Sequence, residues 1–391
     1  MRTTDIAIVG GGLAGSIAAA MLGRAGVSAM LIDPHPVYPV DFRCEKLGGN
    51  QLAILHKTGL AEAALRATTH DGSVWIARFG RLVDRKPSDQ YGIRYEALVN
   101  AMRAEIPARI PLLHAKATAI STGETYQRVT LSDGVDISAR LVVLANGLNK
   151  GLRRTLGIEH RIVSECHSVT IGFDLAPIGR QHFPFRALTY YPERPSDRMA
   201  YLTLFPIGDA MRANLMVYRP LDDPWLQQLR CAPEDTLHQL MPRLGRLTGD
   251  FSVAGELKIR PADLYAVEGH RQAGLVLIGD AFATSCPAAG TGTDKVFTDA
   301  ERLCNIHIPN WLATPGMGRD KIEAFYDDPV KVACDDRARE KAFHLRALST
   351  DNGLTWQARR WARFVARSAQ GWGRRIAARP ADADARHRVA Y

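Results

Sequence analysis

Three glycines near the amino end have the spacing of a phosphate-binding turn. The pattern is GxGxxG, formed by Gly10, Gly12 and Gly15. Gly10 permits a tight turn, Gly12 lets a pyrophosphate approach the backbone, and Gly15 lets a helix pack closely on a strand. The free N–H groups at the start of that helix, at Leu13 and Ala14, are the donors that phosphate oxygens need.

A carboxylate completes this candidate site. A second apolar stretch ends at Asp33, whose side chain can accept hydrogen bonds from both ribose hydroxyls of an adenosine. To bring this acid beside the glycines, the chain must run through a strand at 6–9, the glycine turn, a helix to about residue 26 and a second strand. That order predicts a dinucleotide-binding βαβ unit, whereas a glycine-rich turn without a ligand explains neither the acid nor the spacing.

A second glycine turn lies far along the chain. The apolar stretch 275–278 is followed by Gly279 and Asp280, and a helix begins near Thr293. The residues between them that shape the turn are Pro287, Gly290 and Gly292. A helix that begins after such a turn stabilises negative charge with its dipole and its free N–H groups.

Together the two turns resemble those of the FAD-dependent monooxygenases of the p-hydroxybenzoate hydroxylase type. The late motif of that family is a strand, Gly-Asp, a Pro, G-x-G and a helix with DA..L, matched in order by Gly279, Asp280, Pro287, Gly290, Gly292, Asp299, Ala300 and Leu303. The resemblance implies that Asp280 binds the ribityl chain of FAD and that the helix start at Gly292 and Thr293 faces the flavin pyrimidine edge. Because FAD is long, each turn holds one end of it.

The resemblance covers residues 5–155 and 270–310 and implies further contacts with FAD. It assigns Arg43 to FAD, Arg94 to the pyrophosphate or ribityl chain, and the backbone near Ala117 to the adenine. Weaker candidates in the loop after Arg43 are Glu45, Lys46 and Gln51.

Several side chains near the expected flavin have no assigned role. Lys295, in the first turn of the late helix, points either to solvent or toward the cofactor or substrate. Cys286 precedes Pro287 and is interpreted as a small buried thiol. No catalytic base is assigned, because the possible ones each have a structural explanation: His167, His182 and Tyr191.

The resemblance also implies the fold class, an α/β Rossmann-like FAD-binding domain with an inserted β-sheet substrate domain and a helical C-terminal segment. The FAD-binding domain is expected in two parts, at 1–158 and 271–330, with the inserted domain at 159–270 and the C-terminal segment at 331–391. Alternating apolar residues predict strands in the inserted domain, at 168–175, 185–191, 199–205 and 213–219.

The activity implied by the resemblance is that of a monooxygenase. NAD(P)H reduces FAD, oxygen adds at flavin C4a, and the hydroperoxide oxygenates an aromatic or apolar organic substrate. Asn146-Gly147 stands where the family usually has Asp-Gly, an Asp associated with FAD and NAD(P)H. Related flavoproteins stay open: a prenyl-chain or C=C reductase, favoured by KLGG at 46–49, a dehydrogenase, or a halogenase, although the W-x-W-x-I-P motif of halogenases is absent.

The composition indicates the cellular compartment and the class of partner. The six cysteines are scattered without a CxxC pattern or a Cys/His cluster, which argues against a metal site or a disulfide framework and favours reduced thiols in a cytoplasm. The sequence has no run of 18 apolar residues, so no transmembrane helix is expected. The expected partner is a small-molecule substrate rather than nucleic acid, and the oligomeric state is left open.

Much of the net charge of +9 lies near the C-terminus. Residues 353–380 hold seven arginines and no acid. The apolar residues among them approximate one helical stripe: Trp361, Phe364, Val365, Trp372 and Ile376. Either the helix docks this stripe on its own FAD domain, or it makes peripheral contact with an anionic membrane surface. Gly371 and Gly373 predict a break in the helix.

Overall fold

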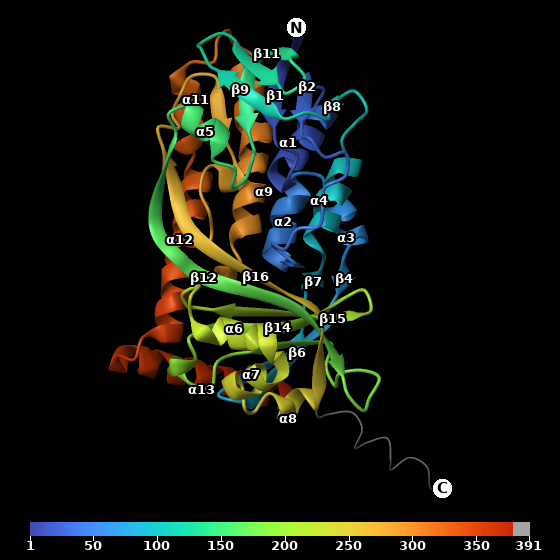
Figure 1. Ribbon diagram of the computed structural model, residues 1–391, viewed down its shortest axis with the longest axis vertical. Helices are drawn as coiled ribbons and strands as arrows, with labels where there is room; N and C mark the ends of the chain where they lie inside the picture. The colour runs from blue at the N-terminus through green and yellow to red at the C-terminus, as the bar shows by residue number, and fades with distance from the viewer. Residues whose placement is uncertain (378–391) are drawn as a thin grey trace. The chain divides into compact units, whose positions relative to one another are not determined.

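The computed structural model describes residues 1–377, with side chains through residue 374, and divides into two compact units (Figure 1). Unit 1 comprises residues 1–70, 90–170 and 260–343, and unit 2 comprises residues 71–89, 171–259 and the chain from residue 344. Each unit has its own sheet with helices, so the expected mixed α/β fold with a helical C-terminal region is confirmed. The expected domain bounds stay a prediction.

The sheet of unit 1 has β1 near its centre. Its strands are β1 (Arg2–Val9), β2 (Ala29–Ile32), β8 (Leu112–Leu113), β9 (Ala117–Ser121), β10 (Gln127–Leu131), β11 (Asp136–Leu144) and β17 (Leu275–Leu277). The order is β8-β2-β1-β11-β10-β9, with β17 beside β11. The strands β8, β2, β1, β11 and β17 pair in parallel, and β10 pairs antiparallel with both β11 and β9. Ile6 and Ile8 on one face of β1 and Ala7 and Val9 on the other are all buried, as in a sheet with both faces covered.

Small residues let α1 (Leu13–Arg24) lie close to this sheet. All of its residues are buried except Arg24, and it packs against α4 (Tyr95–Ala104), α9 (Gly292–Arg302) and β2. The other helices of unit 1 are α2 (Gly49–Lys57), α3 (Ala61–Arg66), α5 (Gly151–Thr155), α10 (Ile308–Leu312), α11 (Arg319–Tyr326) and the first part of α12 (Pro329–Thr350). Unit 1 also contains a small three-stranded sheet, with the order β3 (Lys46–Leu47), β7 (Tyr91–Gly92) and β4 (Thr69–His70).

The sheet of unit 2 is mostly antiparallel. Its order is β16 (Phe251–Glu268), β12 (Glu159–Pro177), β15 (Ala210–Val217), β14 (Met199–Ile207), β13 (Ala187–Tyr190), β5 (Ser73–Arg78) and β6 (Arg81–Pro87). The strands β12 and β16 are long, and their residues 159–170 and 260–268 belong to unit 1. The alternating stretches of the sequence therefore form strands as expected. The helices α6 (Pro224–Cys231), α7 (Pro233–Leu240) and α8 (Gly245–Thr248) follow β15 in the chain.

The C-terminal helix α13 (Leu354–Ala377) is continuous, so the expected break at Gly371 and Gly373 is wrong. A Cβ at Gly371 would lie 2.1 Å from the carbonyl oxygen of Val83, so this glycine lets the helix approach β6 closely. That tertiary contact outweighs the low helix propensity of glycine. Arg379 lies outside the described residues, as do the side chains of Arg375 and Ile376.

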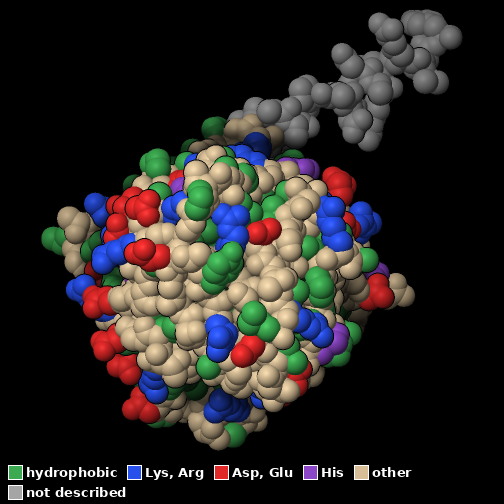
Figure 2. Space-filling view, turned by 90° about the horizontal axis from the view of Figure 1, so that it is seen from above, with side chains coloured by type: hydrophobic (Ala, Val, Ile, Leu, Met, Phe, Trp, Pro, Cys, Tyr) green, Lys and Arg blue, Asp and Glu red, His purple; other side chains and the backbone are tan. Residues whose placement is uncertain are grey.

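Positive and negative side chains are interspersed on the face of the molecule that Figure 2 shows. On the face in Figure 2, Lys and Arg side chains are interspersed with Asp and Glu, and hydrophobic side chains form scattered patches. Within residues 1–377 no helix has both the length and the apolar content that a membrane span requires.

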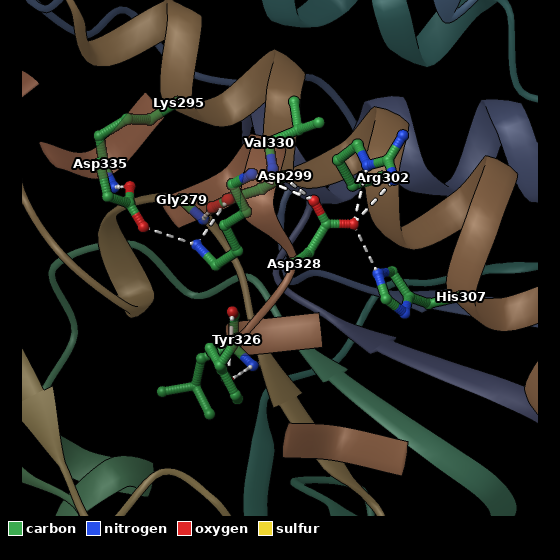
Figure 3. Close-up of polar contacts among 11 residues, drawn as sticks. Gly279, Lys295, Asp299, Arg302, His307, Tyr326, Asp328, Val330 and Asp335 are labelled. Carbon is green, nitrogen blue, oxygen red and sulfur yellow. Dashed lines mark hydrogen bonds and ion pairs between the residues drawn. The ribbon is translucent and has the colours of Figure 1, made fainter. Parts of the chain in front are cut away.

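Buried ion pairs join α12 to α9 (Figure 3). Lys331 Nζ lies 2.8 Å from Asp299 Oδ1 and 3.1 Å from Asp335 Oδ2, and the Lys331 and Asp299 side chains are each 1% exposed. Burial opposes the charge of Lys331, but the two carboxylates raise its pKa above the ordinary value. Asp299 also accepts the N–H of Gly279 at 2.9 Å. Lys295 pairs with Asp335, so it points neither to solvent nor into an open site.

We predict that Lys331→Met lowers the free energy of unfolding by about 3–5 kcal/mol, because it leaves the Asp299 carboxylate buried without its counter-ion. Urea unfolding followed by circular dichroism measures the change. Arg339→Met is the matched control on α12, since its partner Asp336 is half exposed and such surface pairs contribute about 0–1 kcal/mol. Equal losses in the two variants would contradict the assignment.

Candidate functional site

The first glycine turn has the close contacts that its sequence predicts. Gly10 has a φ of +105°, and a Cβ there would lie 2.5 Å from the carbonyl oxygen of Ala145. A Cβ at Gly15 would lie 1.9 Å from the carbonyl oxygen of Gly10. At Gly12, by contrast, the nearest heavy atom to a Cβ is a ring carbon of Tyr38 at 3.9 Å. The turn is therefore tight where the strand and helix meet and open at the start of α1, where phosphate oxygens would bind.

Asp33 is fixed at the end of β2 by three donors. Its carboxylate accepts the N–H of Gly11 at 2.7 Å and the N–H of His35 at 2.9 Å. Arg103 Nη2 lies 3.1 Å from the same carboxylate and donates to the carbonyl of Gly11. Arg103 comes from the last turn of α4, and its sequence position does not distinguish it from a solvated arginine. It compensates the charge of Asp33 and ties α4 to the glycine turn.

A cavity of about 780 Å³ in unit 1 runs past these residues. Of the residues predicted to bind the cofactor, those that line it are Gly10, Gly12, Leu13, Ala14, Asp33, Arg43, Ala117 and Asp280. Those that do not line it are Gly15, Arg94, Gly279, Pro287, Gly290, Gly292 and Thr293. Most of the latter belong to the second glycine turn. Tyr38, Tyr95 and Asn146 are among the other residues that line it.

The Gly279–Asp280 turn is held from several elements at once. Arg43 Nη1 donates to Asp280 Oδ2 at 2.9 Å, from the loop after β2. Arg153 Nη1 donates to the carbonyl of Ala281 at 2.6 Å and to that of Asp280 at 3.3 Å. The hydroxyl of Tyr265, on β16, also donates to the carbonyl of Asp280. The Asp280 carboxylate is one-third exposed and lies in the cavity wall.

Arg43 belongs to a set of alternating charges. Its Nε lies 2.5 Å from Asp41 Oδ2, and Arg260 Nη1 lies 2.8 Å from Asp41 Oδ1. Burial disfavours the ionised carboxyl, yet Arg43 and Arg260 lower the pKa of Asp41. Burial of Tyr38, which donates to Asp41 at 3.1 Å, raises its pKa to about 12. Near neutral pH Asp41 is therefore ionised and Tyr38 is neutral, so the ion pair between Arg43 and Asp41 is maintained.

Arg153 is fully buried on α5 and adds positive charge behind the turn. His160 stacks on Tyr265 with ring centres 4.3 Å apart. Burial and the nearby Arg153 lower the pKa of His160 to about 4, so this imidazole is neutral at neutral pH. The sequence shows Arg153 only as a basic residue after Asn146-Gly147, because its carbonyl partners follow more than a hundred residues later.

The second glycine turn is supported from α2. Gln51 Nε2 donates to the carbonyl of Gly290 at 3.0 Å, and Gly290 has a φ of +64°. Gln51 also accepts the N–H of Gly48 at 2.7 Å. Helix α9 begins at Gly292 without a side-chain cap, which leaves its first N–H groups available to a ligand. Gln51 therefore positions the turn from which α9 begins.

The remaining candidates have structural partners. Arg94 begins α4 and lies 3.5 Å from the buried carboxylate of Glu45. Cys286 is fully buried beside the hydroxyl of Ser168 at 3.5 Å. His167 contacts the hydroxyl of Ser164 and the carbonyl of Ala342 through its two ring nitrogens. Within the described chain no three His, Cys, Asp or Glu side chains are grouped to hold a metal ion.

Comparisons with known proteins agree with this arrangement. Residues 3–307 match the family model described as FAD binding domain. The chain is 23% identical to 6-hydroxynicotinate 3-monooxygenase of Bordetella bronchiseptica, over 90% of this chain and 91% of that protein. It is 24% identical to 3-demethoxyubiquinol 3-hydroxylase of Escherichia coli, over 84% and 87%.

A solved structure shares the fold. The crystal structure of p-nitrophenol 4-monooxygenase PnpA from Pseudomonas putida DLL-E4 superposes with a TM-score of 0.73 at 16% sequence identity. The superposition covers 95% of this chain and 95% of PnpA. The likeness shows a common architecture, to which the family match adds the cofactor. The chain belongs to the FAD binding domain family and is an FAD-dependent oxidoreductase of the flavoprotein monooxygenase class.

Proposed function

We propose that this protein hydroxylates an aromatic substrate with NAD(P)H and O2. The observation that carries the proposal is one cavity whose wall includes both the first glycine turn with Asp33 and the Asp280 carboxylate. A long dinucleotide can therefore contact both, and FAD fits that requirement. The relatives support the reaction class, since by their names they are monooxygenases or hydroxylases that act on 6-hydroxynicotinate, 3-demethoxyubiquinol and p-nitrophenol.

The residue roles at the adenosine end follow from the geometry of the turn. Backbone N–H groups at Gly12, Leu13 and Ala14 bind the pyrophosphate, because α1 begins there without a side-chain cap. Asp33, fixed by Arg103, accepts the ribose hydroxyls, and the backbone at Ala117, which lines the same cavity, contacts the adenine. Gly10 and Gly15 shape the turn.

At the flavin end, Asp280 binds the ribityl chain and Arg43 orients the Asp280 carboxylate. The turn made by Pro287, Gly290 and Gly292 presents the start of α9 at Thr293 to the flavin pyrimidine. The dipole of α9 favours negative charge at that position. Bound FAD supplies the redox chemistry that activates oxygen; the chain binds it, orients it and supplies this electrostatic environment.

The setting of the reaction is also part of this proposal. The aromatic substrate is a small molecule, and NAD(P)H is the reductant, although Asn146 replaces the Asp usual in similar enzymes. All six cysteines are free thiols, which supports a cytoplasmic location. Peripheral contact with a membrane through the basic C-terminal helix is retained as the proposed second partner.

We predict that the purified protein is yellow and holds about one non-covalent FAD per chain. Acid precipitation should release free FAD, measured by absorbance and fluorescence of the supernatant. A colourless protein that stays colourless after incubation with FAD would refute the cofactor assignment.

We predict that Asp280→Ala weakens FAD binding by about one to two decades in Kd, since a hydrogen bond to a charged group contributes roughly 1.5–3 kcal/mol. Quenching of flavin fluorescence by the apoprotein gives the Kd. Asn146→Ala is the matched control, because Asn146 lines the same cavity but lies outside the Gly-Asp turn. If both variants keep the affinity of the parent, the role given to Asp280 is wrong.

We predict that an aromatic substrate couples NAD(P)H oxidation to oxygen uptake, and that labelled dioxygen places one labelled atom in the product. An oxygen electrode, absorbance of the reduced nicotinamide and mass spectrometry measure the three quantities together. NAD(P)H consumption with substrate reduction and no oxygen uptake would instead support a reductase, the alternative favoured by Lys46–Gly49.

A further inference from the structure

Two faces of α13 differ in how far their side chains are buried. The side that packs toward β6 contains Trp356, Phe364 and Gly371, which are buried or half-buried. Another side carries large apolar residues in the open, with exposed fractions of 84% for Leu354, 59% for Trp361, 60% for Val365 and 69% for Trp372.

These four exposed residues form one continuous row, here called the apolar row. Their spacings of seven, four and seven residues place them on the same helix face. The exposed residues near that face include the small Ala358, Ala362 and Ala369, and the polar Gln357 lies at its edge. Trp361 stacks on Phe79 at 5.2 Å yet stays more than half exposed, so packing within unit 2 does not account for the row. A row of this length, with two tryptophans, marks an interaction surface.

The charges on α13 identify the kind of partner. Residues 354–374 hold five arginines and no acid. Arg374 pairs with the buried Asp84, and Arg360 donates to the carbonyls of Leu348 and Asp351. The other three recur every four residues on the side away from the apolar row: Arg359, Arg363 and Arg367. All three are exposed, and their recorded partners carry no negative charge.

This excess of positive charge contributes to the lowered pKa values of two nearby groups. Burial, Arg363 and Arg359 lower the pKa of His344. Burial also lowers the pKa of Arg78, with Arg363 and Arg367 adding to the effect. A second copy of this helix would bring like charges together without acids between them. An anionic surface is instead attracted to them.

We propose that α13 docks on an anionic lipid bilayer, with the apolar row in the interface and Arg359, Arg363 and Arg367 on its polar side. An in-plane amphipathic helix has this division, with Trp and Leu on one face and Arg on the other. Tryptophan favours the membrane–water interface. Arginines on the polar face of such a helix are attracted electrostatically to anionic lipids, and this attraction weakens as salt concentration rises.

The test uses the FAD-loaded full chain and vesicles of phosphatidylcholine, alone or mixed equally with phosphatidylglycerol. Co-sedimentation should occur with the mixed vesicles at low salt, weaken at high salt and be small with phosphatidylcholine alone. The Val365→Gln/Trp372→Gln variant should lose about ten-fold or more in partitioning, because it removes apolar surface from the interface. The Arg359→Gln/Arg363→Gln/Arg367→Gln variant should lose the preference for the mixed vesicles.

Leu221→Gln is the control, since Leu221 is 55% exposed in unit 2 and lies outside α13. Unchanged FAD content and melting temperature show that each variant is folded. Binding measured this way needs no turnover, so it is independent of the proposed reaction. Absence of binding to mixed vesicles, equal binding to both kinds, or dimerisation in solution lost with Val365→Gln/Trp372→Gln would each overturn the proposal.

Discussion

The buried hydrogen bond from the Gly279 N–H to the Asp299 carboxylate is the contact on which the Gly279–Asp280 turn depends. An ionised carboxylate out of contact with water is stable only when its charge is compensated, and Lys331 on α12 supplies that charge. The direction of the Asp280 side chain follows from the position of Gly279, its neighbour. The turn after β17 is therefore fixed to α9 and α12 through one pair of opposite charges.

The same turn is also held by two arginines and a tyrosine hydroxyl. Arg43 contacts the Asp280 carboxylate, and Arg153 and Tyr265 contact backbone carbonyls of the turn. Arg43 thus orients a carboxylate and Arg153 orients backbone carbonyls. The cofactor therefore binds to groups whose positions are already fixed. Such preorganisation reduces the reorganisation that binding and reaction would otherwise require.

Local sequence determined what could be predicted. The glycines and Asp33 were recognisable because their roles depend on backbone conformation and on spacing within one βαβ unit, and the cavity in unit 1 includes Gly10, Gly12 and Asp33. Arg103 and Lys331 were not recognisable, because their partners lie on other elements and any surface arginine or lysine looks the same in sequence. The expected break at Gly371 failed for a similar reason, since the contact with Val83 is tertiary.

The late arrival of β17 has a consequence for the order of events during synthesis. Residues Val142–Leu144 of β11 pair with Leu275–Leu277, so this edge of the sheet stays without its partner until the ribosome has added the residues between them. At about 5–20 residues per second, that interval is on the order of ten seconds. A nascent chain released early would expose an unpaired apolar edge and lack Asp280. The part of the cavity wall that contains Asp280 is thus completed only late in synthesis.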